Sequence, residues 1–101
     1  MTIEEYKKEF DGRPAVVKFS TTWCQPCKVM GKTLEKLEPQ YPNVKFVYVD
    51  VEDSDELVQQ FQISSVPVTL FISADGEKFE RKTGLMPEKA IIEEIDKITA
   101  K

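Results

Sequence analysis

The chain contains no histidine, only two cysteines and no run of basic residues, and each shortage excludes a class of function. Without an imidazole, catalysis by a cysteine–histidine pair is excluded. Zinc and iron–sulfur sites normally take four Cys or His ligands, so one chain cannot complete such a site, and only a metal shared between two chains remains as an alternative. A net charge of −4 without a basic run leaves no electrostatic footprint for nucleic-acid binding.

Long apolar segments are missing as well. The longest apolar run is far shorter than a membrane span, and the residues from Met1 to Glu5 are polar and acidic, unlike a signal peptide. We therefore expect a cytoplasmic protein that does not associate with membranes. Its 101 residues, 41% hydrophobic and 32% charged, are typical of one globular domain covering residues 1–101, and we expect a monomer.

What the chain does contain is a pair of cysteines with two residues between them, in the segment Trp23-Cys24-Gln25-Pro26-Cys27-Lys28. This spacing places two thiols one helical turn apart, directly after a predicted strand. The first sulfur faces the unpaired N–H groups and the positive dipole end of the helix, which favours the thiolate. A purely structural disulfide here would close too small a loop to stabilise much. The pair therefore predicts reversible thiol–disulfide exchange, carried by the Cys24–Cys27 disulfide without a further cofactor.

The apolar pattern and the turn residues predict an α/β protein. The predicted helices cover residues 2–11, 25–39 and 53–61 and a last segment beginning at Pro87, and the predicted strands cover residues 15–20, 44–51, 68–73 and 78–83. The third helix has a capping-box pattern at its start, and residues 74–77 form a hairpin turn. The right-handed crossover rule and the hairpin then predict a mixed four-stranded sheet in the order two-one-three-four, with helices on both faces.

Two of the predicted helices have a face that we expect to pack inward. In the helix over 25–39 this face comprises Val29, Met30, Thr33, Leu34 and Leu37. In the last helix it comprises Ile91, Ile92, Ile95 and Ile98, while Glu93, Glu94, Asp96 and Lys97 remain in contact with solvent.

These motifs, taken in order, resemble the thioredoxin family over essentially the whole chain. The matching parts are Trp23 to Lys28 after a strand, the βαβ unit, Val66-Pro67 before the hairpin, and Gly84 before the last helix. The resemblance implies a thioredoxin-like fold that lacks the usual N-terminal edge strand, because the chain begins at the family's first helix. Glutaredoxins are a less similar family, since Gly84 to Pro87 does not supply their Gly-Gly segment for glutathione.

The resemblance also implies a role for each matching residue. Cys24 would be the exposed nucleophile and Cys27 the buried resolving thiol. Supporting roles in the active site fall to Trp23, Gln25, Pro26, Lys18 and a cis Pro67, and client binding falls to Trp23, Ser65, Val66, Pro67 and Gly84. The implied function is the reduction of disulfides in client proteins, with a thioredoxin reductase restoring the dithiol.

Simpler interpretations of these residues remain open at this stage. Trp23 could be an ordinary packing residue, Pro67 could begin an edge strand, and Gly84 could be only a turn residue. A protein with this fold could also be a redox-inert docking module, although docking does not require two cysteines.

Lys18 is the clearest departure from the family pattern. Counting back from Cys24 places Lys18 where the family usually has a buried aspartate. Tyr48 stands where many members have the lysine that pairs with that aspartate. Gly31-Lys32 stands in place of a helix-kinking proline. An ammonium beneath the cysteine turn would favour a thiolate, whereas an aspartate disfavours it. The alternative is that Lys18 extends to solvent, toward a carboxylate such as Glu52, and contacts neither sulfur.

Overall fold

The computed structural model describes residues 12–74 and 78–99. The helix predicted over 2–11 and most of the predicted turn at 74–77 lie outside these ranges. The elements are the strands β1 (Ala15–Ser20), β2 (Lys45–Asp50), β3 (Val68–Ile72) and β4 (Phe79–Thr83), the helices α2 (Gln25–Leu37), α3 (Asp55–Gln60) and α4 (Glu88–Thr99), and the short 3-10 helices η1 (Glu38–Gln40) and η2 (Val51–Asp53). No helix within these ranges is long and apolar enough to cross a membrane.

The sheet confirms the predicted topology. Its four strands have the order β2-β1-β3-β4, in which β1 pairs in parallel with β2 and antiparallel with β3, and β4 is antiparallel to β3. The parallel pair follows from the helical crossover through α2, and the antiparallel pair at the other side follows from the hairpin. Lys18 lies opposite Tyr48 on one neighbouring strand and Thr69 on the other.

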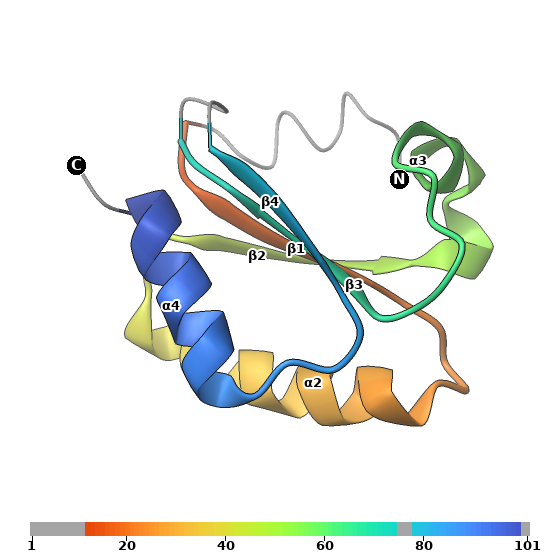
Figure 1. Ribbon diagram of the computed structural model, residues 1–101, viewed down its shortest axis with the longest axis horizontal. Helices are drawn as coiled ribbons and strands as arrows, with labels where there is room; N and C mark the ends of the chain where they lie inside the picture. The colour runs from red at the N-terminus through yellow and green to blue at the C-terminus, as the bar shows by residue number, and fades with distance from the viewer. Residues whose placement is uncertain (1–11, 75–77, 100–101) are drawn as a thin grey trace.

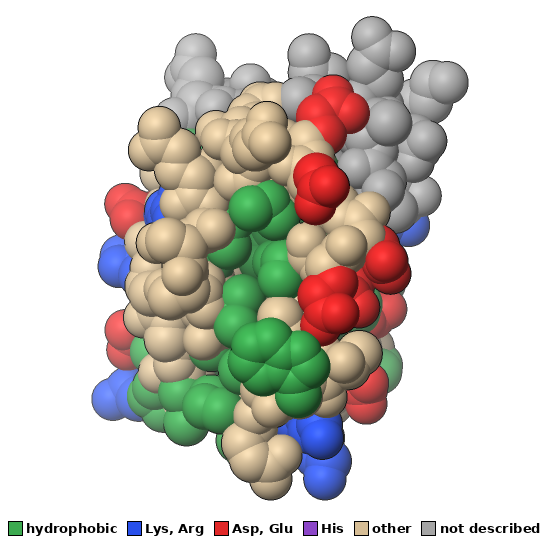
Figure 2. All heavy atoms as spheres, turned by 90° about the vertical axis from the view of Figure 1, so that its right-hand side faces the viewer, with side chains coloured by type: hydrophobic (Ala, Val, Ile, Leu, Met, Phe, Trp, Pro, Cys, Tyr) green, Lys and Arg blue, Asp and Glu red, His purple; other side chains and the backbone are tan. Residues whose placement is uncertain are grey.

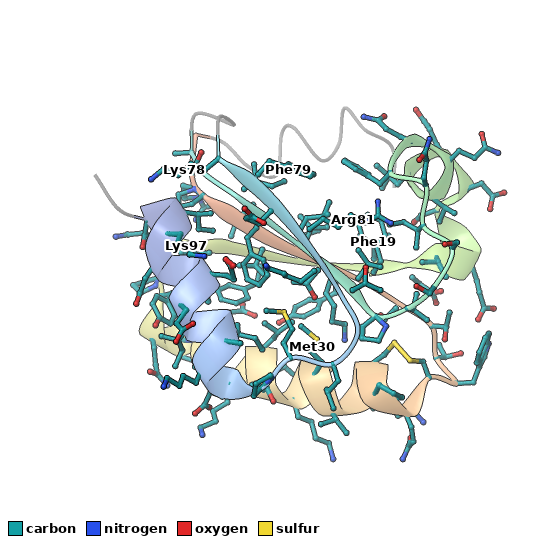
Figure 3. All side chains as sticks on the ribbon, viewed as in Figure 1. Phe19, Met30, Lys78, Phe79, Arg81 and Lys97 are labelled. Carbon is teal, nitrogen blue, oxygen red and sulfur yellow. A yellow bond between two sulfur atoms is a disulfide. The ribbon has the colours of Figure 1, made fainter. Side chains whose placement is uncertain are left out.

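Two apolar clusters lie on opposite faces of the sheet. Val16 of β1 belongs to the cluster that α2 and α4 cover, and Val17 belongs to the cluster completed by Leu57 of α3. Figure 1 shows α2 and α4 together on one side of the sheet, with α3 beyond its other end. Figure 3 shows Phe19 and Met30 on opposite sides of the strands, and both are fully buried, as predicted for Met30. The alternation of β1 between these faces places Lys18 on the same side as α2.

Helix α2 is shorter than predicted and has a different buried face. It ends at Leu37, and Glu38 to Gln40 form a 3-10 turn because Pro39 cannot continue the α-helical hydrogen bonds. The residues that it buries are Cys27, Met30, Gly31, Leu34 and Leu37. Val29 was predicted to face inward but is 51% exposed, because the buried face begins at Cys27 and Val29 lies two residues, more than half a turn, away from it.

Several other boundaries and environments differ from the sequence prediction. Val51 leaves the strand and begins η2, and α3 begins at Asp55 with Ser54 as an N-cap that makes no side-chain capping bond. In α4 the predicted isoleucines face inward, with Ile92 partly buried, but Glu94 is only 4% exposed rather than in contact with solvent. Its carboxylate pairs with Lys82 at 3.5 Å and Lys97 at 3.3 Å, which explains why a charged residue can lie against the sheet.

Candidate active site

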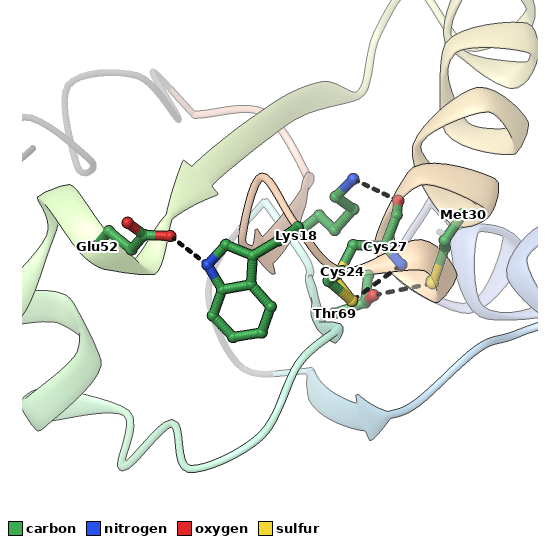
Figure 4. Close-up of a disulfide and its surroundings, with 7 residues drawn as sticks. Lys18, Cys24, Cys27, Met30, Glu52 and Thr69 are labelled. Atoms are coloured by element: carbon green, nitrogen blue, oxygen red, sulfur yellow. Dashed lines mark hydrogen bonds between the residues drawn. A yellow bond between two sulfur atoms is a disulfide. The ribbon is translucent and has the colours of Figure 1, made fainter.

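The two cysteines form a disulfide at the beginning of α2. Cys24 is the N-cap residue, in an extended backbone conformation, and Cys27 lies within the first turn, with 5.2 Å between the two Cα atoms. The backbone N–H of Cys27 donates to Sγ of Cys24 at 3.2 Å (Figure 4). Cys24 is 8% exposed and Cys27 only 1%. Both cysteines are therefore buried in the disulfide form, so Cys24 is not exposed as predicted, although it is the more accessible of the two.

The local sequence determines the electrostatics of this helix end. Pro26 stands in the first turn, where its missing N–H has no helical partner to lose, and Gln25 is exposed beside it. No acidic residue occupies the first turn. The positive end of the helix dipole is therefore not offset by a carboxylate in this turn, and it favours negative charge on the Cys24 sulfur.

Trp23 forms an exposed rim next to the disulfide. Its side chain is 74% exposed, and its Nε1–H donates to Oε1 of Glu52 at 2.9 Å (Figure 4). Glu52 is held in turn by the preceding acidic residue, because its backbone N–H donates to Oδ1 of Asp50 at 2.9 Å. Trp23 is thus held at the surface by a polar contact, and it does not serve as a packing residue.

The loop before β3 forms the opposite side of the site. The Val66–Pro67 peptide bond is cis, and the Pro67 carbonyl accepts a 2.8 Å hydrogen bond from the N–H of Gly84. Pro67 does not begin an edge strand, because β3 lies between β1 and β4. Gly84 has a φ of +94°, a conformation that L side chains rarely adopt, and this requirement alone explains a glycine there.

A groove of about 220 Å³ brings several of the predicted residues together. It is lined by Trp23, Ser65 and Val66 and also by Thr21, Val51, Glu52, Ile63 and Ser64. Figure 2, which views the end of the molecule at the right of Figure 1, shows an apolar stripe with carboxylates gathered along one side. Ser65 is exposed and Val66 half-buried. The predicted client-binding residues Trp23, Ser65 and Val66 therefore share one groove.

Lys18 lies beneath the first turn of α2, with its ammonium pointing toward the backbone carbonyl of Cys27 (Figure 4). It is 7% exposed, and its Nζ donates to the carbonyl oxygen of Cys27 at 3.0 Å. The same ammonium lies 5.6 Å from the centre of the Tyr48 ring. The extension of Lys18 to solvent near Glu52 is therefore wrong, because the side chain is buried and bonds the Cys27 backbone. The other part of that alternative, in which Lys18 contacts neither sulfur, agrees with this bond, since its acceptor is a carbonyl oxygen.

Comparison with known proteins identifies this arrangement. A sequence model described as Thioredoxin matches residues 1–97. The chain belongs to the thioredoxin family. The thioredoxin of Chlamydia trachomatis is 35% identical over 82 residues, which are 81% of this chain and 79% of that protein.

Solved thioredoxin structures agree with this assignment. The structure of chloroplastic thioredoxin z superimposes with a TM-score of 0.87 at 27% identity, covering 100% of this chain and 93% of that one. The thioredoxin of Fasciola hepatica superimposes with a TM-score of 0.83 at 31% identity, covering 96% and 91%. Family membership together with the Cys24–Cys27 disulfide makes this chain a thiol–disulfide oxidoreductase. Within the described ranges, no group of three or more His, Cys, Asp and Glu side chains is placed to hold a metal ion.

Three features of this thioredoxin-family site were not assigned from the sequence. Glu52 was considered only as a partner for Lys18, but it binds Trp23. Thr21 is 8% exposed, lines the groove, and has a hydroxyl without a hydrogen-bond partner among the described residues. Gly31 lies directly against the Lys18 ammonium. A glycine inside a helical pattern is a signal that sequence analysis can detect, whereas the contacts of Thr21 and Glu52 depend on segments distant in the chain.

Proposed function

We propose that this protein reduces disulfide bonds in other proteins, and that a partner of the thioredoxin reductase type returns Cys24 and Cys27 to the dithiol form. The cysteine pair itself carries the two electrons, and no cofactor is required. The observation that carries this proposal is the difference between the two sulfurs. Cys24 caps the helix and accepts an N–H bond, whereas Cys27 is almost fully buried.

The different surroundings of Cys24 and Cys27 indicate which sulfur acts in each step of the exchange. The Cys24 thiolate attacks one sulfur of the client disulfide, forms a mixed disulfide, and releases the other client sulfur as a thiolate. Cys27, after losing its proton, attacks the Cys24 sulfur and releases the second client sulfur. The Cys24–Cys27 disulfide is then formed, and the client has gained two electrons. The reductase supplies the same two electrons to begin the next cycle.

The groove beside Trp23 supports a protein client. Its walls come from the Trp23 turn and from the loop that carries Ser65 and Val66, next to the cis Pro67 and Gly84. An extended client segment would pair with the backbone of Val66, in the manner of an added strand, and contact the indole with its apolar side chains. This mode gives affinity with little demand on the client sequence.

The test is the reduction of insulin disulfides by dithiothreitol, followed by turbidity. We expect the parent protein to accelerate the reaction and the Cys24→Ser variant to give the rate of dithiothreitol alone. A parent protein no faster than dithiothreitol would overturn the proposal and favour the redox-inert docking module. If the Cys24→Ser variant still binds the client, its inactivity is due to the missing sulfur and not to damage to the client-binding groove.

We also propose that the protein works in the cytoplasm as a monomer. The two cysteines of the chain both belong to the active site. They must be returned to the dithiol form for catalysis, and a reducing compartment favours that form. Sedimentation equilibrium of the oxidised and reduced forms tests the monomer, and fractionation of the source cells tests the compartment.

A further inference from the structure

We propose that Lys18 and Gly31 act as one unit, in which the missing side chain of Gly31 leaves room for the Lys18 ammonium and this ammonium stabilises the thiolate of Cys27. The resolving role of Cys27 rests on the function proposed above. Lys18 is a positioning residue in this scheme, because it contacts the backbone of the resolving cysteine and not the client.

Burial and hydrogen bonding define the position of the ammonium. Lys18 stands on β1 between Tyr48 and Thr69, and its side chain crosses beneath α2 to reach the carbonyl oxygen of Cys27 at 3.0 Å. Its 7% exposure means that bulk water screens its charge little. The residue that it bonds, Cys27, has a side chain that is itself only 1% exposed.

Gly31 explains how a lysine fits at this place. A Cβ built on Gly31 would lie 2.8 Å from Nζ of Lys18, closer than Cβ atoms are found to any neighbour. Gly31 is inside α2 without a positive φ, so the backbone does not require glycine there. A glycine inside a helix is less favourable than alanine, and we infer that space for the ammonium offsets that cost.

The groups around Lys18 act on its charged form in both directions, and burial has the largest effect. Burial lowers the pKa of Lys18 from its ordinary value, and the Glu35 carboxylate on α2 acts in the opposite direction. The face of the Tyr48 ring attracts the cation, and Thr69 from β3 is neutral. Lys28 and Lys32 of α2 line the same pocket with Lys18 and Glu35, and Glu38 bonds the Tyr48 hydroxyl. Lys18 itself occupies the position at which the family usually has a buried aspartate, so none of these groups supplies a carboxylate at that position.

The chemical consequence concerns the second step of the exchange. A thiol as buried as that of Cys27 loses its proton reluctantly, because burial disfavours the thiolate. An ammonium cannot accept that proton, but it stabilises the anion once the proton has passed to water. The thiolate then attacks the Cys24 sulfur as before. Where the family pattern has an aspartate that can accept a proton, Lys18 supplies a fixed positive charge. The ammonium can occupy this position because residue 31 has no side chain.

The test titrates Cys27 alone, in the reduced Cys24→Ser background, by the ultraviolet absorbance of its thiolate. Lys18→Met keeps most of the stem and removes the charge. Gly31→Ala keeps the charge and displaces it, because Nζ is the mobile end of a long side chain and moves more readily than the helix. We expect both variants to raise the pKa of the Cys27 thiol, by about one unit for Lys18→Met. Lys32→Met, which removes an exposed ammonium of the same pocket, is the matched control and should move it less.

The double variant distinguishes this proposal from two independent effects. With Lys18→Met in place, Gly31→Ala should cause no further change in the Cys27 titration, because there is no ammonium left to displace. An unchanged titration in Lys18→Met would overturn the proposal and leave Lys18 as a tether between β1 and α2. An equal effect of Gly31→Ala with and without Lys18 would overturn the pairing. The measurement uses no client protein, so its result is independent of insulin reduction.

Discussion

At the scale of single residues, the surroundings of the two sulfur atoms predict different reactivity. Cys24 accepts the N–H of Cys27 at the start of α2, and Cys27 is covered by the helix and the sheet. In the reduced protein, limiting iodoacetamide should therefore label Cys24 first, and the pKa of Cys24 should lie below that of a free thiol. Peptide mapping of the labelled protein checks this, and preferential labelling of Cys27 would reverse the assignment of roles.

The same asymmetry predicts which variant captures clients. Cys27→Ser retains the attacking sulfur and removes the resolving one, so it should accumulate mixed disulfides with client proteins on non-reducing gels. Cys24→Ser, its matched control, should accumulate none. Similar trapping by the two variants would mean that the helix end does not distinguish the thiols.

Tyr48 predicts an alkaline limit to stability. Loss of solvation, followed by its hydrogen bond to Glu38 and the charges of Glu38 and Glu35, raises the pKa of Tyr48 from its ordinary 10.0. The unfolded chain then loses this proton at a lower pH than the folded protein does. The stabilisation is complete below pH 10.0, the ordinary pKa of this group, and is lost as the pH rises above that value.

We therefore expect the free energy of unfolding to fall less steeply above about pH 10 in Tyr48→Phe than in the parent. Urea titrations of the oxidised proteins measure this. Lys18, with a pKa lowered by burial, contributes in the opposite direction in the alkaline range, and it is present in both proteins. Identical alkaline profiles would show that Tyr48 does not titrate differently in the folded state.

At the scale of elements, α4 shows that buried positions on one helix differ in their contribution to stability. Ile95 is fully buried in the cluster between α4 and the sheet. Its neighbour Glu94 is almost as enclosed, but one of its oxygens, Oε2, has no hydrogen-bond partner among the described residues. Burial thus stabilises the protein at Ile95, whereas at Glu94 the cost of desolvating a carboxylate opposes the gain from its ion pairs.

This contrast gives a quantitative expectation. Ile95→Ala should lower the free energy of unfolding by about 2–5 kcal/mol, because it leaves a cavity in the core. Glu94→Met, which keeps the volume and removes the charge, should change it by less than about 1 kcal/mol, since Lys82 can turn to water. Urea denaturation of the oxidised variants provides both values. A loss at Glu94 as large as that at Ile95 would show that its ion pairs hold α4 in place.

At the scale of the whole molecule, the acidic charge of the protein is concentrated beside the groove. The net charge is −4, and the segment from Asp50 to Glu56 contains five carboxylates and no lysine or arginine. Glu52, Asp53, Asp55 and Glu56 are exposed there, and Figure 2 shows carboxylates gathered along one side of the apolar stripe. A field of one sign next to a binding groove accelerates the approach of oppositely charged partners and is screened by salt.

A disulfide peptide with basic flanking residues should therefore be reduced faster than its acidic counterpart, and added salt should reduce the difference. The variant Asp53→Asn with Glu56→Gln, which leaves the Glu52 contact with Trp23 in place, should reduce it as well. Stopped-flow measurements of Trp23 fluorescence on reaction with each peptide give the rates. Equal rates for both peptides at low salt would show that the acidic segment does not influence the approach of clients.

The sequence by itself determined the order of the elements, the sheet order and the position of the cysteine pair at a helix start. These follow from local causes: the period of the apolar residues, the turn residues, and the crossover rule, which leaves few topologies for such a chain. The two faces of β1 follow from the alternation of side chains along a strand, which places Val16 in one cluster and Val17 and Phe19 in the other.

Only the tertiary structure decided which side chains meet. Trp23 and Glu52 are 29 residues apart in sequence, and no local pattern links them. The exposure of Val29 and the burial of Glu94 depend on how each helix is rotated against the sheet, which packing determines and periodicity resolves only coarsely. The ammonium of Lys18 could reach solvent or the cysteine turn with equal ease in an isolated strand. It lies against Cys27 and Gly31 of α2, and these two neighbours are brought to β1 only in the folded molecule.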